Sequence, residues 1–146
     1  MSVVQRFYPE FFFSATHSQI LGPDEDIDCH VALFDEEAVF NANHGVSFSL
    51  PYQEISDTDQ PVTLQVTRDG VKLLFSVPEI SWNDLLNSHF RHVIIWRQLI
   101  SGGKNVFYPL MHIDLGTSML PIAGGFTLTP DEICIPKIDL SYEVCT

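Results

Sequence analysis

Basic residues are scarce in this sequence. The 146 residues include seven Lys and Arg against 19 Asp and Glu, so the formal net charge is −12. Such a chain would repel a phosphate backbone instead of releasing counterions from it, and we expect no nucleic acid among its partners. Because only 18% of the residues are charged, much uncharged surface is left for protein contacts, as suits a component of an assembly.

Long apolar runs and a cysteine framework are also missing. No run approaches the ~18 apolar residues needed to cross a bilayer, and the first residues lack the pattern of a signal peptide. We therefore expect no membrane partner and synthesis in the cytoplasm. The three cysteines, Cys29, Cys134 and Cys145, cannot all pair within one chain. We expect them to be reduced, with Cys29 and Cys134 as small apolar core residues.

Sequence signatures of catalysis are absent as well. There is no nucleophile elbow, and the six histidines include no pair at the i, i+4 spacing of a helical metal site. The segment SGGK at 101–104 lacks the first glycine of a phosphate-binding loop, and Asn105 replaces its Ser or Thr, so we interpret it as a hairpin loop. We expect no enzymatic activity, no cofactor and no metal, and predict no catalytic, cofactor-binding or metal-binding residue.

What the sequence does contain is strand patterning. VTLQVT at 62–67 alternates apolar and polar residues, and VKLLFSV at 71–77 resumes the alternation after the turn residues 68–70. This pattern predicts a β-hairpin. Gly- and Pro-bearing breaks separate further predicted strands at 27–34, 90–97, 106–115, 125–129 and 138–144.

Helical signals are few. Residues 81–89 predict about two helical turns, with Ser81 as N-cap and Asp84 as its capping-box partner. The apolar residues of 9–21 match neither the helical nor the strand period, so this segment is either a short helix or an irregular strand. Seven or more short strands with this punctuation predict an all-β fold with one or two short helical turns. We expect a single β-sandwich or jelly-roll-like domain over residues 1–146.

Aromatic and exposed apolar residues suggest where the chain packs and binds. We interpret six aromatic residues as core between two sheets, and the alternative is a platform on which a ligand stacks. These residues are Trp82, Phe90, Trp96, Phe107, Tyr108 and Phe126.

Apolar residues in loops are costly on a monomer and often mark subunit contacts. The predicted interface residues are Phe11, Phe12, Phe13, Met119, Leu120, Pro121 and Ile122.

The order of several short motifs adds a family resemblance. The motifs are Phe7-Tyr8, DEDID (24–28), HVALF (30–34), LLFSVPEISWND (73–84), HVIIWR (92–97), YPLMHIDLG (108–116) and GGFTLTPDEICI (124–135). This order resembles that of small structural proteins of tailed-phage virions. The chain departs from the pattern at Trp96, where a tyrosine is usual, and at 43–55, which replaces a segment rich in Gly and Tyr.

The resemblance implies a protein that works through shape and not through chemistry. It would be a capsid decoration or cement protein, or else a tail or connector component, in contact with the major capsid protein or other virion proteins. It would form homo-oligomers and be found in the virion, after assembly in the host cytoplasm. The acidic composition leaves open a cytosolic binding or immunity module that caps a basic partner. An enzyme would require a deep polar pocket with clustered histidines.

Overall fold

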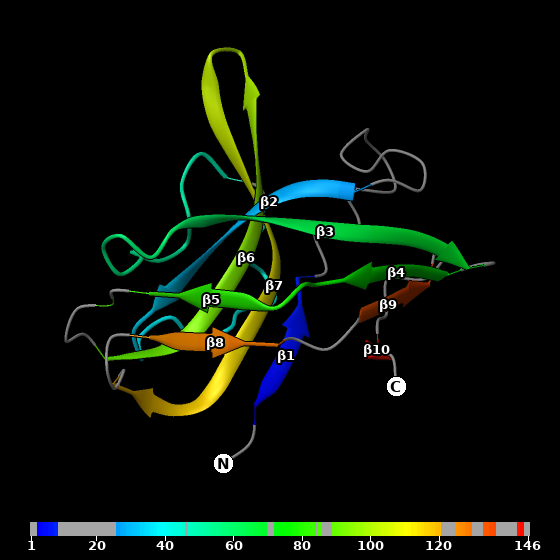
Figure 1. Cartoon of the computed structure of the whole chain (residues 1–146). Helices are drawn as coiled ribbons and strands as arrows, with labels where there is room; N and C mark the ends of the chain where they lie inside the picture. Colours follow the sequence, from blue (N-terminus) through cyan, green and yellow to red (C-terminus); the bar gives the residue numbers. More distant parts are fainter. Residues whose placement is uncertain are drawn as a thin grey trace.

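Two long neighbouring strands, β6 (Phe90–Ser101) and β7 (Lys104–Met119), form the centre of the fold (Figure 1). The computed structural model describes residues 3–8, 26–45, 47–69, 72–83, 85, 89–120, 125–129, 133–136 and 143–144. The other strands are β1 (Val4–Phe7), β2 (Asp26–Phe34), β3 (Gln60–Asp69), β4 (Lys72–Ser76), β5 (Ile80–Trp82), β8 (Phe126–Leu128), β9 (Ile133–Pro136) and β10 (Glu143–Val144). Over these described ranges the chain forms no helix, and so none that could span a membrane. The predicted all-β class is confirmed.

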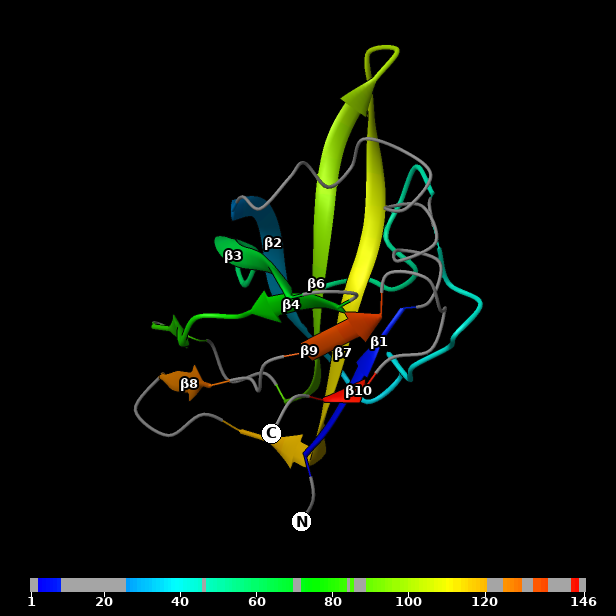
Figure 2. The same cartoon turned by 90° about the vertical axis from the view of Figure 1, so that its right-hand side faces the viewer.

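Eight strands form one antiparallel sheet, in the order β1-β7-β6-β2-β3-β4-β9-β10, and β5 pairs with β8 in a second, small sheet. The large sheet curls. Phe7 in β1 lies 5.7 Å from Phe75 in β4, measured between ring centroids, although four strands separate β1 and β4 in the order. In Figure 2, β4 and β9 lie in front of the β6–β7 pair, and in Figure 1 the pair is crossed by β5 and β8. The curl encloses the core between parts of the same sheet, which is consistent with the predicted sandwich.

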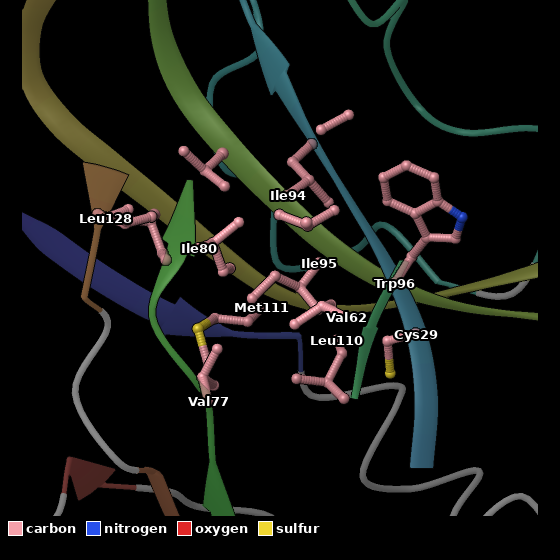
Figure 3. Packing of buried hydrophobic residues seen from close by; sticks show 14 of the residues in the cluster. Cys29, Val62, Val77, Ile80, Ile94, Ile95, Trp96, Leu110, Met111 and Leu128 are labelled. Atoms are coloured by element: carbon pink, nitrogen blue, oxygen red, sulfur yellow. The ribbon is translucent and has the colours of Figure 1, made fainter. Parts of the chain in front are cut away.

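The small sheet covers part of this core. Ile80 of β5 and Leu128 of β8 are buried, and Figure 3 shows both side chains directed into the cluster that contains Ile95 and Met111. Burying one such side chain contributes about 1.5–3 kcal/mol. Sequence-distant segments are therefore held together mainly by apolar contact.

The six aromatic residues that were predicted as core are buried or partly buried in it. Trp82, Phe90 and Trp96 are buried, and Phe107, Tyr108 and Phe126 are partly buried against the same cluster. Cys29 is buried too, as expected for a small apolar residue. The side chain of Cys134 and all of Cys145 lie outside the described part of the structure.

Two predicted turns occur where expected. β3 and β4 pair antiparallel up to Asp69↔Lys72, which confirms the hairpin, although residues 70 and 71 of its turn lie outside the description. In SGGK, Ser101 pairs with Lys104. Gly102 and Gly103 have φ angles of 60° and 78°, as a two-residue type I′ hairpin turn requires. The hairpin-loop interpretation of this segment is confirmed.

The predicted helix start at Ser81 is wrong. Ser81 lies in β5, opposite Thr127 of β8, and their hydroxyl oxygens are 3.0 Å apart. This cross-strand pairing outweighs the local capping signal. Asp84 and the segment 9–21 lie outside the described residues, as does most of the strand predicted at 138–144. β1 and β9 were not predicted.

Candidate interaction site

The end of the β6–β7 hairpin projects from the sheet as a two-stranded arm. β2 pairs with β6 only as far as His30↔Trp96, whereas β6 and β7 remain paired out to Ser101↔Lys104. We call residues 97–108 the arm. In Figures 1 and 2 its turn stands well beyond the other strands. Ile100, near the turn, is 77% exposed, which is costly for an apolar side chain of this size.

A loop braces one side of this arm. Ser47 and Phe107 exchange two backbone hydrogen bonds, with N–O distances of 3.1 and 2.8 Å. The next residue, Phe48, is 69% exposed. The Lys104 ammonium lies 5.6 Å from the centroid of the Phe48 ring, within the range of a cation–π contact. The loop therefore places a second exposed apolar side chain next to Lys104 of the arm.

A cavity of about 340 Å³ opens at the base of the arm. We call it the Glu54 pocket. Its lining residues come from the loop at 48–54, from Asp59 and from the two arm strands: Phe48, Ser49, Leu50, Tyr52, Gln53, Glu54, Asp59, Trp96, Gln98 and Phe107. The lining thus combines four aromatic rings with two carboxylates. A larger hollow of about 510 Å³ beside β3 and β5 contains no aromatic side chain.

Ring stacking and hydrogen bonds fix one wall of the pocket. The His30 ring stacks on Trp96 with centroids 5.6 Å apart and planes 15° apart. His30 Nδ1 lies 3.0 Å from Asp59 Oδ1. The Trp96 indole N–H donates to Gln98 Oε1 over a long 3.4 Å. The carboxylate of Asp59 is therefore held in place beside the aromatic wall.

Glu54 is the under-paired group of the pocket. Its Oε2 is covered and accepts no hydrogen bond from any residue that the structure describes. Burial raises the pKa of the Glu54 carboxyl, the nearby Asp59 raises it further, and His30 opposes the change. A covered carboxylate without a partner is costly to keep ionised, and a neighbouring cation would relieve that cost.

A second polar cluster lies inside the core, where His92 of β6 faces His112 of β7. Their ring centroids are 4.8 Å apart, and the residues are 2% and 1% exposed. His112 Nε2 is 2.7 Å from the carbonyl oxygen of Ala38. Since a carbonyl only accepts, Nε2 carries the proton, and Nδ1 has no partner within the part of the chain that the structure describes. Burial lowers the pKa of His112 to about 4.

Charged groups border this histidine pair. His92 Nδ1 is 4.0 Å from Asp114 Oδ1, and Arg91 Nε donates to the same oxygen at 3.0 Å. Burial lowers the pKa of His92, although Asp114 opposes the change. Both rings are therefore neutral near pH 7, and neither lines the Glu54 pocket or the hollow beside β3. Within the described ranges, no group of three or more His, Cys, Asp or Glu could hold a metal ion.

Neither cluster was predicted from the sequence. His92 and His112 lie in two strands that were predicted, but placing them together requires the β6–β7 register, in which His92 is opposite Asp114 and His112 is opposite Ile94. The Glu54 pocket has no motif, because a loop and two strands create it. A cluster of acidic and aromatic residues at 48–59 is its only local signal.

Two of the predicted interface residues can be placed in the structure, and both lie away from the Glu54 pocket. Met119 ends β7 at the opposite end from the arm, where it packs partly buried against the core, and Leu120 is 49% exposed. The other five, Phe11, Phe12, Phe13, Pro121 and Ile122, lie outside the described residues. The structure does not bring Met119 and Leu120 to the Glu54 pocket, and this interface remains a prediction.

Comparison with known proteins finds no match for this chain. No protein-family model, no curated protein and no solved structure matches the chain. The arm and its pocket are therefore interpreted from their own geometry.

Proposed function

We propose that this chain is a structural protein of a tailed-phage virion, a capsid decoration protein that acts through protein–protein contacts. The order of sequence motifs supports the virion assignment. The observation that carries the mode of action is the projecting arm, which presents Ile100 to solvent, together with the exposed Phe48 on the loop that braces it.

The energetics of the arm fit such a role. Burying Ile100 or Phe48 against a neighbour would contribute about 1.5–3 kcal/mol for each side chain. One such contact is weak, but symmetry repeats it around a particle, and linked contacts bind far more tightly than each one alone. The arm can therefore attach a small protein to the major capsid protein, or to copies of itself, without a deep binding site.

Peptide mass spectrometry of purified particles tests the proposal. A decoration protein will be present at a high copy number related to the symmetry of the shell. A low copy number related to the symmetry of the tail would support a tail or connector position instead. Absence from purified particles would remove the virion assignment altogether.

A second candidate is an acidic binding module that caps a basic partner. The Glu54 pocket favours it, because two carboxylates and four aromatic rings meet at one surface hollow, and the formal charge of −12 would steer a basic protein toward the chain. Capture of one stoichiometric basic protein that is not part of a virion, together with absence from particles, would select this function.

A further inference from the structure

We propose that the Glu54 pocket receives an arginine side chain from a neighbouring protein. The inference rests on the proposed function in one respect, since it names the chemistry of a contact that the function requires. It also specifies which part of the surface makes that contact: the hollow at the base of the arm, between the loop at 48–54 and the strands β6 and β7.

The two carboxylates of the pocket favour a cation as its ligand. Glu54 Oε2 is covered and has no hydrogen-bond partner among the described residues, and Asp59 is close enough to disfavour ionisation of Glu54. The ring of His30 bonds to one oxygen of Asp59. A positive group in the hollow would face both carboxylates, and because their charge is spread over both oxygens, it need not touch the covered atom.

The aromatic lining points to the same class of ligand. Phe48, Tyr52, Trp96 and Phe107 surround the hollow. The chain's own Lys104 places its ammonium 5.6 Å from the Phe48 ring centroid, so one ring of the lining is already within the range of a cation–π contact. A neutral ligand would stack on these rings equally well but would leave the Glu54 carboxylate uncompensated.

Among cationic side chains, arginine fits best. The planar guanidinium stacks on aromatic faces, is less strongly hydrated than an ammonium and offers five N–H donors. The residues that line the pocket include three with side-chain acceptors: Glu54, Asp59 and Gln98. Its volume of about 340 Å³ is at the small end of the range for ligand sites, about 300–1,000 Å³. One side chain is therefore a better occupant than a larger molecule.

Titration of the isolated full chain with small probes tests this directly. The probes are the N-acetyl amides of arginine, of lysine and of citrulline, which has the shape of arginine without its charge. The indole N–H signals of the two tryptophans are followed by NMR, because Trp96 lines the pocket and Trp82 does not. We expect the arginine probe to shift the Trp96 signal saturably at millimolar concentration and to bind about tenfold more tightly than either other probe.

Two variants with the same loss of charge locate the effect. Glu54→Gln removes the covered carboxylate, and Glu37→Gln removes an exposed one from the turn after β2. We expect E54Q to weaken arginine binding about tenfold and E37Q to change it less than twofold. Because the Glu54 carboxylate is desolvated without a partner, E54Q should also raise Tm, by about 1–3 °C. A residue with a purely structural role would lower it.

Three results would overturn the inference: equal binding of the citrulline probe, binding of the lysine probe as tight as that of arginine, or an equal effect of E37Q and E54Q. These results are separate from the test of the proposed function. If the protein is found in particles but the probes do not discriminate, only the arginine site fails. If arginine binds selectively and the protein is absent from particles, only the virion assignment fails.

Discussion

The Trp82 indole N–H donates a hydrogen bond of 2.7 Å to the carbonyl oxygen of Thr58, 24 residues earlier in the chain. Trp82 also stacks on Phe126, with ring centroids 5.9 Å apart. The Thr58 hydroxyl in turn bonds to the backbone oxygen of Ile55 at 2.7 Å and accepts from the N–H of Leu33 at 3.1 Å. One indole thus connects the small sheet to the turn before β3 and, through Thr58, to β2.

The substitution Trp82→Phe tests this connection. Phenylalanine keeps most of the apolar bulk but leaves the buried Thr58 carbonyl without its donor, so we expect a loss of about 1–3 kcal/mol in the free energy of unfolding. The measurement is urea denaturation followed by circular dichroism. Trp96→Phe is the matched control, because it removes similar volume but only a long hydrogen bond of 3.4 Å. Equal losses in both variants would show that volume, and not the hydrogen bond, matters at Trp82.

Stability should fall in mild acid because of His112. Burial lowers its pKa from 6.5 to about 4 in the folded chain, while the Ala38 carbonyl, His92, Asp114 and Arg6 make smaller contributions of both signs. As pH falls from about 6.5 to about 4, the unfolded chain takes up this proton first, so unfolding becomes more favourable. The free energy of unfolding therefore keeps its full value, as far as His112 is concerned, above pH 6.5. It has fallen by on the order of 3 kcal/mol at about pH 4.

The pH dependence can be assigned with two variants. Urea midpoints for the unchanged chain should fall between pH 7 and pH 4, and the fall should be clearly smaller in His112→Gln, which cannot titrate. His89→Gln is the control because His89 is exposed, and it should keep the original profile. A profile in H112Q as steep as in the unchanged chain would contradict the assignment to His112.

The arm turn depends on its two glycines. Gly103 has a φ of 78° with no atom near the position of an added Cβ, so Gly103→Ala would meet backbone strain but no clash. We expect a cost of about 1 kcal/mol in denaturation experiments. The control is Gly125→Ala, where φ is not positive and the nearest atom, the Trp82 carbonyl oxygen, is at an ordinary 3.7 Å. A larger loss from G125A than from G103A would contradict this account of the turn.

Ile100 should matter for attachment and not for folding. Because its side chain is 77% exposed, Ile100→Ser should change the free energy of unfolding by less than about 0.5 kcal/mol. The same variant should lower the copy number in purified particles. Val3→Ser removes an apolar side chain that is 55% exposed next to β1, away from the arm, and should leave the copy number unchanged. Equal incorporation of both variants would exclude the arm as the attachment site.

The sequence predicts best the strands that carry a clear local pattern. Alternation predicted β2 and the β3–β4 hairpin, β-branched and aromatic residues predicted 90–97 in β6, and SGGK predicted the turn between β6 and the strand expected at 106–115. Residues 81 and 82 of β5 were interpreted as the start of a helix because Ser81 and Asp84 match a capping box. The strand predicted at 125–129 contains β8, but its Thr127 is 46 residues from Ser81, and no local pattern indicates that the two strands pair. β1 and β9 have only four residues each, too few for periodicity to stand out.

The candidate site was beyond sequence reasoning for the same reason. Glu54, Asp59 and Trp96 meet only because the loop at 47–50 bonds to Phe107 on the arm and His30 of β2 stacks on Trp96 of β6. Such contacts follow from sheet register and curl, which alternation alone does not determine. Composition predicts uncharged surface for protein contacts, but it cannot predict where on the fold such surface lies.

Electron cryo-microscopy of purified particles tests the central claim most directly. The account predicts density for this chain on the capsid in symmetry-related copies, with residues 97–105 of the arm covered by a neighbouring subunit. Particles without this density, or copies whose arm extends into solvent while another surface makes the attachment, would contradict it.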